Sequence, residues 1–333
     1  MSIQATRVLF ATTLSGIAAV IAMQSAGVAA ARPSLKVPTS GQVQHTRAFM
    51  TADAATGRVP ILFVSDVHNG AVYLYNAGRL GAGPIGTITD GVNGSGGPGD
   101  MTVDGRGNLY VAAAPGLVQV YSPGGLHPAR TIQFSGRSLA SVAASADGTL
   151  AIFGNGDFEQ DGTLYIFDRG SLTPTRTIDI PIDSSDGNFV FTEHALFVDT
   201  SDDVFFSVSR YGSGDGAVEE FLPGSTQPIN TSLLRGDAIG FDASGNYYAG
   251  LGFRINAFAA GSPSPSRFIR QGITGQAFFT VLADGTLFVP NTATQNGRGD
   301  VVEYAPGGSR PVATIRTSDD INPFGTAYRP ANR

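Results

Sequence analysis

The sequence contains carboxylate and amide side chains that could together hold a divalent cation. Their oxygens are the ligands that Ca²⁺ prefers, and a bound cation can act as a Lewis acid in hydrolysis or elimination. The five candidate metal ligands are Asp100, Asn155, Glu193, Asp237 and Asn291. They are spread over much of the chain, so a fold must bring them to one place before they can act together.

A second set of polar side chains could contact a ligand without a metal. It consists of Asp66, His68, Asp157, His194, Arg210 and Gln276. Glu193 and His194 do not form an acid–base pair in this prediction, because adjacent residues of an extended segment point to opposite sides. Asp157, Glu159 and Asp161 alternate as in a calcium loop, but the closing Glu of the EF-hand pattern is missing. No catalytic motif is evident, and the catalytic residues of any enzymatic activity are not identified by the sequence.

Composition and missing motifs exclude several functions. The chain has no cysteine, which rules out disulfides, thiolate metal sites and a cysteine nucleophile. No G-x-S-x-G elbow or G-x-x-x-x-G-K phosphate loop is present, so serine-hydrolase and nucleotide-binding functions lack support. A net charge of −6, with Lys36 as the one lysine, disfavours nucleic acid and anionic membranes as partners.

The elements that must position these residues are short strands in a repeated unit. There are 44 Gly and 19 Pro among Val, Phe, Tyr, Thr and Ile, a composition typical of strands joined by tight turns. A D-G-N-like turn followed by an apolar strand recurs, and the strand begins near Leu62, Leu109, Leu150, Val204, Tyr247 and Leu287. Each unit continues with a third strand, a Pro/Gly turn and a fourth strand. Four strands in roughly 40 to 45 residues make one propeller blade, so we predict an all-β, six-bladed β-propeller of four-stranded antiparallel blades.

The two ends of the repeat region predict how the ring closes. The chain enters at a second strand, Ile61 to Val64, and ends in a stretch that resembles a first strand, Gly325 to Tyr328. We therefore expect the C-terminal strand to be the innermost strand of the first blade. Joining N- and C-terminal strands in one blade would remove an open sheet edge.

The repeat resembles a known kind of propeller. Gly107-Asn108-Leu109-Tyr110-Val111 and Val118 to Gly125, which ends in Ser-Pro-Gly-Gly, are similar to NHL-type repeats and their exported bacterial relatives. The resemblance covers the chain from about residue 60. It extends to lactonase-like propellers, which hold a divalent metal at the channel mouth with Glu, Asn and Asp. That resemblance implies Ca²⁺ or another divalent cation as the possible cofactor.

Loop lengths indicate which face of the propeller carries a site. Connections from first to second and from third to fourth strands are short and uniform, and they form one face, the turn face. Connections from second to third strands and between blades vary in length, and they form the other, the variable-loop face. Variable loops usually carry recognition. We therefore expect all the candidate residues above to act at the variable-loop face, around the channel mouth.

The first part of the chain predicts export. Arg7 is followed by an apolar run from Val8 to Met23 and by small residues through Ala31, the pattern of a cleaved secretory signal. We predict a signal peptide at residues 1–30, a flexible N-terminal arm at 31–58 and the propeller at 59–333. The mature protein would be periplasmic or extracellular, a monomer, with no membrane span.

Together these patterns predict an exported propeller scaffold that binds an unidentified protein, peptide, glycan or small molecule on its variable-loop face. The alternative is a divalent-metal-dependent, lactonase-like hydrolase or lyase with its site at the channel mouth.

Overall fold

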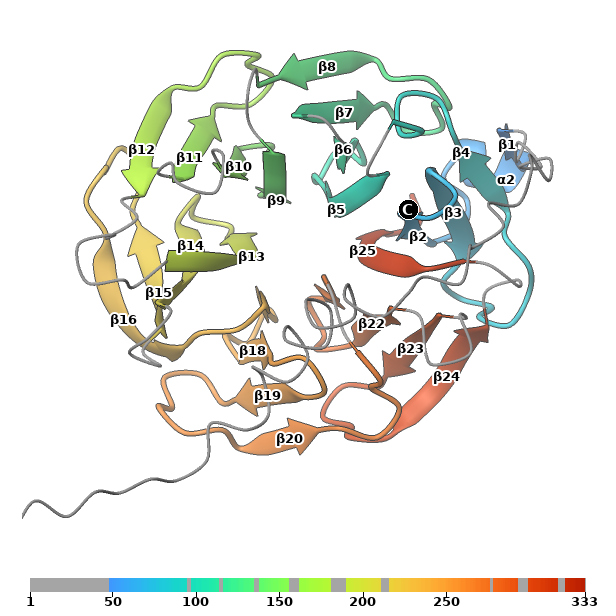
Figure 1. The fold of residues 1–333 in the computed structure, drawn as a ribbon. Coiled ribbons are helices and arrows are strands. Elements are labelled where there is room, and N and C mark those ends of the chain that lie inside the picture. The colour runs from blue at the N-terminus through green and yellow to red at the C-terminus, as the bar shows by residue number, and fades with distance from the viewer. Residues whose placement is uncertain are drawn as a thin grey trace, which may run out of the picture. The chain divides into compact units, whose positions relative to one another are not determined.

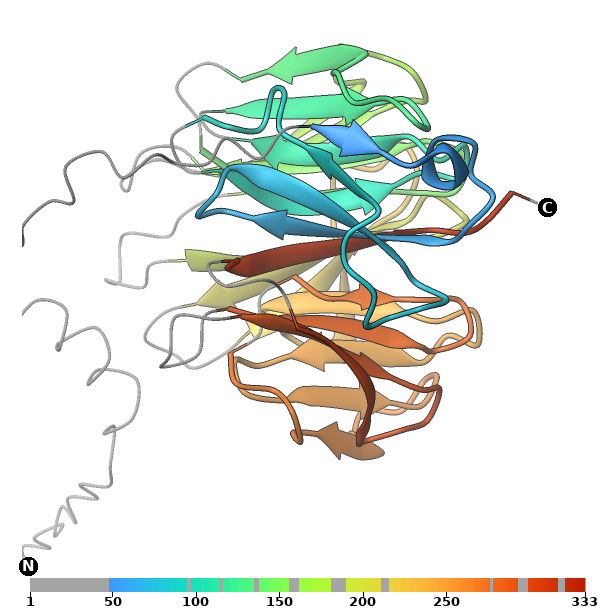
Figure 2. The ribbon, with the colours of Figure 1, turned by 90° about the vertical axis from the view of Figure 1, so that its right-hand side faces the viewer.

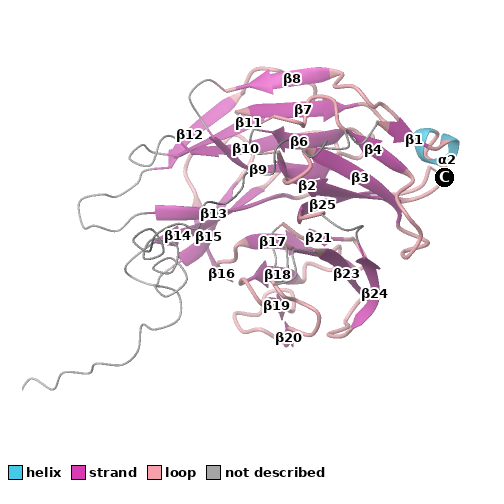
Figure 3. Ribbon diagram, turned by 45° about the vertical axis from the view of Figure 1, so that its right-hand side comes forward, coloured by secondary structure: helices cyan, strands magenta, loops and turns pink. Residues whose placement is uncertain are grey.

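The computed structural model describes residues 48–94, 97–113, 116–134, 138–155, 162–180, 190–210, 216–275, 278–292, 299–316 and 321–332. All of them belong to the unit Thr46–Arg333. Nearly every element in these ranges is a strand, as Figure 3 shows, and the one helix is the single turn α2 (Ala52–Ala55). No helix in the described ranges has the length and hydropathy needed to cross a membrane.

In the described ranges, twenty-five strands form six antiparallel sheets around a common centre (Figure 1). Blade 1 has the order β1 (Phe49–Met50), β4 (Gly86–Ile88), β3 (Ala71–Asn76), β2 (Ile61–Asp66) and β25 (Pro323–Arg329), from outside to inside. Blade 2 contains β5 (Pro98–Val103), β6 (Leu109–Ala113), β7 (Leu117–Tyr121) and β8 (Arg130–Gln133). Blade 3 contains β9 (Ser138–Ala144), β10 (Leu150–Asn155), β11 (Gly162–Phe167) and β12 (Arg176–Ile180).

The remaining blades repeat this arrangement, with the first strand inside and the fourth outside. Blade 4 contains β13 (Val190–Val198), β14 (Val204–Arg210), β15 (Gly216–Phe221) and β16 (Ile229–Leu234). Blade 5 contains β17 (Ala238–Phe241), β18 (Tyr247–Gly250), β19 (Ile255–Phe258) and β20 (Arg267–Ile269). Blade 6 contains β21 (Thr280–Val281), β22 (Leu287–Asn291), β23 (Asp300–Tyr304) and β24 (Pro311–Arg316). The predicted six-bladed propeller is confirmed.

The D-G-N pattern has a structural cause in the turns between first and second strands. In blade 2 one carboxylate oxygen of Asp104 accepts hydrogen bonds from the backbone N–H groups of Arg106 and Asn108, and the other accepts one from the Asn108 side chain. Gly107 completes the turn at φ +82°, a conformation that suits glycine. The same turn recurs in blade 5 around Asp242.

Apolar side chains from adjacent blades form the core. Six hydrophobic clusters of described residues fill the six spaces between neighbouring blades. Between blades 3 and 4, for example, the rings of Phe153 and Phe206 lie 4.7 Å apart, and both are fully buried. Arginines that open the outer strands add polar links on the turn face, where Arg176 donates to the carbonyl oxygens of Leu222 and Ser225 of the next blade.

The two ends of the described chain close the ring in blade 1, as predicted. β25 pairs antiparallel with β2, with Phe63 opposite Ala327, and Figures 1 and 2 show the two strands side by side. The buried Ser65 hydroxyl donates to the Gly99 carbonyl of blade 2 at 2.8 Å and accepts from the Gly325 N–H at 2.8 Å. One hydroxyl thus ties the second strand of blade 1 both to the C-terminal strand and to blade 2.

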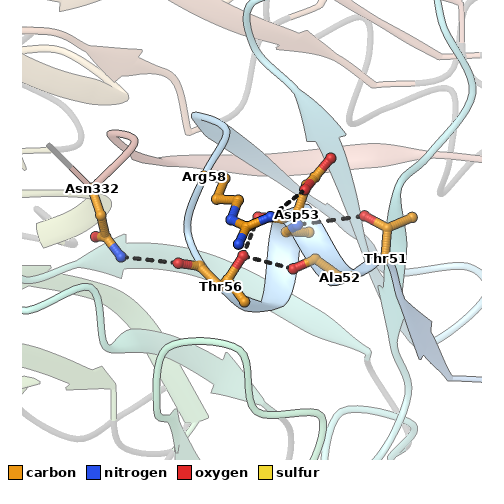
Figure 4. A network of polar contacts seen from close by, with 7 residues as sticks. Thr51, Ala52, Asp53, Thr56, Arg58 and Asn332 are labelled. Atoms are coloured by element: carbon orange, nitrogen blue, oxygen red, sulfur yellow. Dashed lines mark hydrogen bonds and ion pairs between the residues drawn. The ribbon is translucent and has the colours of Figure 1, made fainter.

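Residues 48–58, within the predicted arm, lie against blade 1. β1 pairs with the outer strand β4, which gives this blade a fifth strand. The Thr51 hydroxyl caps α2 by accepting from the Ala54 N–H. From the C-terminal side, Asn332 donates to the Thr56 carbonyl (Figure 4), and the buried Arg329 guanidinium donates to the Ala54 carbonyl at 2.7 Å. The predicted signal peptide, residues 1–30, and the rest of the arm lie outside the described residues.

Candidate functional site

A central channel with a cavity volume of about 740 Å³ runs between the inner strands of the blades. Most of its wall is apolar and comes from β5, β9, β13, β17 and β25 and from residues 278–284. Carboxylates lie in the wall at Asp100, at the start of β5, and at Asp104 and Asp284, in turns between first and second strands. The strand direction places Asp100 toward the variable-loop face and the other two toward the turn face.

Asp100 is the most perturbed carboxyl in the channel wall. It is 7% exposed, and burial raises its pKa from 3.8 to about 7. Its Oδ2 accepts from the Ser141 hydroxyl at 2.6 Å and from the Val142 N–H at 2.9 Å, and its Oδ1 accepts from the Met101 N–H at 2.8 Å. All three donors belong to β5 or β9. The carboxyl therefore links the inner strands of blades 2 and 3.

Asp237 and Asn291, two further predicted metal ligands, make hydrogen bonds within their own surroundings. Asp237 Oδ2 accepts from the Gly252 N–H at 2.8 Å. Asn291 is fully buried, and its amide nitrogen donates to Asp300 Oδ1 and to the Gly272 carbonyl. Asp237 thus holds a loop of blade 5, and Asn291 holds the connection between blades 5 and 6 against β23.

The structure does not bring the described metal candidates into one cluster. No group of three or more His, Asp or Glu side chains that could hold a metal occurs in the described part of the chain. Asn155 ends β10 and Glu193 lies in β13, but their side chains are outside the described part. The metal site with all five ligands stays a prediction.

The predicted ligand-contacting residues are placed only in part. Asp66 is fully buried, and its Oδ1 accepts from the N–H groups of His68, Asn69 and Asn322, so it shapes the turn after β2 and ties it to the segment before β25. His68 is exposed on that turn. His194 lies in β13 and Arg210 ends β14, with side chains outside the described part, and Asp157 and Gln276 fall outside the described residues.

A surface residue that the sequence analysis missed stands out on the variable-loop face of blade 5. Phe253 is 71% exposed, the most exposed large apolar side chain among the described residues. Its turn between β18 and β19 is braced on both sides. The Leu251 N–H donates to the Arg254 carbonyl at 2.8 Å, and the Asp237 N–H donates to the Gly250 carbonyl at 2.7 Å, while Asp237 Oδ2 accepts from Gly252. The available signal was an aromatic residue between Gly252 and Arg254 in a connection of the variable set.

Comparison with known proteins identifies the fold of the chain but not a family to which it belongs. No protein-family model matches the sequence, and no curated protein matches it. Among solved structures, the chain is similar to a protein of unknown function from Bacteroides caccae, with a TM-score of 0.62, 13% identity, and coverage of 81% of this chain and 98% of that one. It is also similar to a chain in the nidogen/laminin complex, with a TM-score of 0.59, 11% identity, and coverage of 82% and 100%. At these identities the likeness concerns the fold alone, and that fold is the six-bladed β-propeller.

Proposed function

We propose that this protein is a non-catalytic binding scaffold whose ligand docks on the variable-loop face, with Phe253 as its apolar anchor. The observation that carries the proposal is the exposure of a large aromatic ring on a turn braced by the three hydrogen bonds described above. The ligand class is a protein, peptide or glycan. The same proposal takes the repeats to be of the NHL type and the protein to act outside the cytoplasm, which the pattern of residues 1–30 supports.

A rigid exposed aromatic ring is well suited to recognition. Phe buries about 200 Å² when it is fully covered, so covering the exposed 71% of Phe253 would remove about 140 Å² from water. At about 25 cal/mol per Å² this amounts to about 3.5 kcal/mol before the cost of association. Because the turn is already braced, little of that gain is spent on ordering the loop.

An array experiment tests the proposal. Peptide and glycan arrays are probed with the labelled protein, and each hit is titrated with the wild type and with Phe253→Ala. We expect the variant to bind about 30-fold more weakly, which corresponds to about 2 kcal/mol. The matched control is Leu172→Ala, which removes an apolar side chain that is 53% exposed in the turn between β11 and β12, on the turn face.

Two outcomes would refute the proposal. One is the absence of any array ligand. The other is equal loss of binding in Phe253→Ala and Leu172→Ala, because that result would place the ligand away from the variable-loop face.

A further inference from the structure

The outer edge of blade 5 is an unpaired strand. β20 is the last strand of its sheet, and in the described part of the chain no strand pairs with its outer side. Alternate residues of such a strand direct their N–H and C=O groups outward, where another extended segment can bind them.

Blade 1 shows that an outer strand of this propeller can accept a further strand. There β1 adds to β4 in antiparallel register, with Phe49 opposite Thr87 and Met50 opposite Gly86. Figure 1 shows β1 outside β4, at the outer edge of blade 1. In blade 1 the added strand comes from the N-terminal segment of the same chain.

The side chains beside the β20 edge form an aromatic and cationic patch. Asn256 pairs with Phe268 across β19 and β20, so the alternation of strands places Arg254, Asn256, Phe268 and Arg270 on one face of the blade. Phe268 is 49% exposed. The guanidinium carbons of Arg254 and Arg270 lie 5.9 and 5.6 Å from the centre of its ring. We name these four residues the blade 5 patch.

The blade 5 patch has unused polar capacity. Within the described part of the chain neither Arg254 nor Arg270 forms an ion pair. Asn256 is only 3% exposed, and its Oδ1 has no hydrogen-bond partner. The two guanidinium groups are therefore the part of the patch that can take up the carboxylates of a ligand.

Local charge indicates the chemistry of the partner. Between residues 235 and 271 the chain carries four Arg and two Asp, although its overall net charge is −6. A segment that approaches β20 therefore meets positive charge, and acidic side chains would complement it.

Three other described outer strands, β12, β16 and β24, lack this combination. β24 exposes Val312 but begins with Pro311, which has no N–H to donate. β16 carries no charged residue, and β12 carries Asp179 beside its single Arg. Neither exposes an aromatic ring among its described side chains.

We infer that an extended acidic segment of another protein adds to β20 as a fifth strand of blade 5. The backbone of this segment forms hydrogen bonds with the outer edge of β20. One of its apolar side chains packs on Phe268, and its carboxylates pair with Arg254 and Arg270. The chain's own N-terminal arm is a poor occupant, because residues 1–52 contain basic residues and no Asp or Glu. A second copy of β20 would bring arginine against arginine.

The test uses a capped nonapeptide of alternating valine and aspartate, labelled at one end and titrated by fluorescence anisotropy at 0.15 M salt. We expect saturable binding to the full chain. A peptide with lysine in place of aspartate, and one N-methylated at alternate residues, should each bind at least tenfold more weakly. Equal binding of the N-methylated peptide would overturn strand addition.

Protein variants locate the site. Arg270→Gln and Phe268→Thr should each weaken peptide binding about tenfold, while Arg79→Gln, which removes an exposed charge from blade 1, should leave it unchanged. All three side chains are at least partly exposed, and thermal melting checks that each variant folds. Equal losses in Arg79→Gln and Arg270→Gln would refute the β20 site.

Two further measurements distinguish the β20 site from the variable-loop face and from a saccharide site. Phe253→Ala should retain peptide binding, so failure at β20 and failure at the variable-loop face are distinguishable. Oligogalacturonate is titrated in parallel. If this acidic saccharide binds more tightly than the peptide and at the same arginines, the proposal of a protein partner is wrong and the blade 5 patch is a glycan site.

Discussion

The Asp100 carboxyl predicts a specific loss of stability as pH rises. Burial raises its pKa from 3.8 to about 7, so between these values the folded protein retains a proton that the unfolded chain has released. The folded state then binds more protons than the unfolded state, and the free energy of unfolding falls with increasing pH. The contribution is fully present below about pH 4 and is lost above about pH 7.

The magnitude follows from the size of the shift. A change from 3.8 to about 7, at about 1.36 kcal/mol per pKa unit, corresponds to about 4 kcal/mol over the whole range. Integration between pH 5 and pH 8 gives a loss of about 2 to 3 kcal/mol. Asp100→Asn cannot titrate, so its unfolding free energy should lack this part of the pH dependence. In that variant the backbone N–H groups of Met101 and Val142 face an amide in place of the carboxyl group. This replacement changes the unfolding free energy by the same amount at every pH.

Urea denaturation at pH 5, 6, 7 and 8 measures the effect. Tyrosine fluorescence and far-UV circular dichroism serve as probes, because the chain has 10 Tyr and no Trp. The difference in unfolding free energy between wild type and Asp100→Asn should fall by about 2 to 3 kcal/mol from pH 5 to pH 8. In Ser141→Ala the loss should extend to higher pH, because the Ser141 hydrogen bond lowers the pKa of Asp100. Parallel pH profiles for wild type and Asp100→Asn would refute the reasoning.

Three further substitutions test the packing and closure of the ring by urea denaturation. Gly105→Ala should lose about 2 to 3 kcal/mol, because its Cβ would clash with the Ala146 carbonyl oxygen; a loss below 0.5 kcal/mol would contradict this contact. Ser65→Ala should lose about 2 kcal/mol by leaving the buried Gly325 N–H without its acceptor, and an unchanged midpoint would show that the closure does not depend on this hydroxyl. Asp202→Gly should gain about 0.5 to 1 kcal/mol, since Asp202 adopts φ 65° where other blades have glycine, and a lower midpoint would refute the strain argument.

The repeated turns made most of the fold predictable from sequence. The second strands β6, β10, β14, β18 and β22 begin at the residues that the D-G-N pattern marked. The signal is local, because an Asp or Ser that accepts from N–H groups a few residues ahead and a glycine at positive φ are both set by neighbouring residues. Closure of the ring was also predictable. The stretch that forms β25 resembles a first strand, and β2 resembles a second strand with no first strand before it, so the two were expected to pair.

The site was less predictable because its chemistry depends on tertiary partners. Asn291 has the side chain of a metal ligand, yet its amide group donates hydrogen bonds to Asp300 and Gly272. No pattern in the sequence reveals those partners. The added strand β1 was missed because a two-residue strand has no periodicity, and its pairing with Thr87 and Gly86 lies far along the chain. Thr51 before Ala52 and Asp53 was the one local cue, as a helix cap.

The pairing of β2 with β25 also constrains the order of events during synthesis. Ile61 and Arg329 are partners across that pair, so the innermost position of blade 1 stays vacant until almost all of the described chain has emerged from the ribosome. Blades 2 to 6 can each form from a contiguous segment as it appears, whereas blade 1 waits for the last strand, β25. Until then the inner edge of β2 is exposed to stray pairing, and the nascent chain is most vulnerable to aggregation just before its final strand arrives.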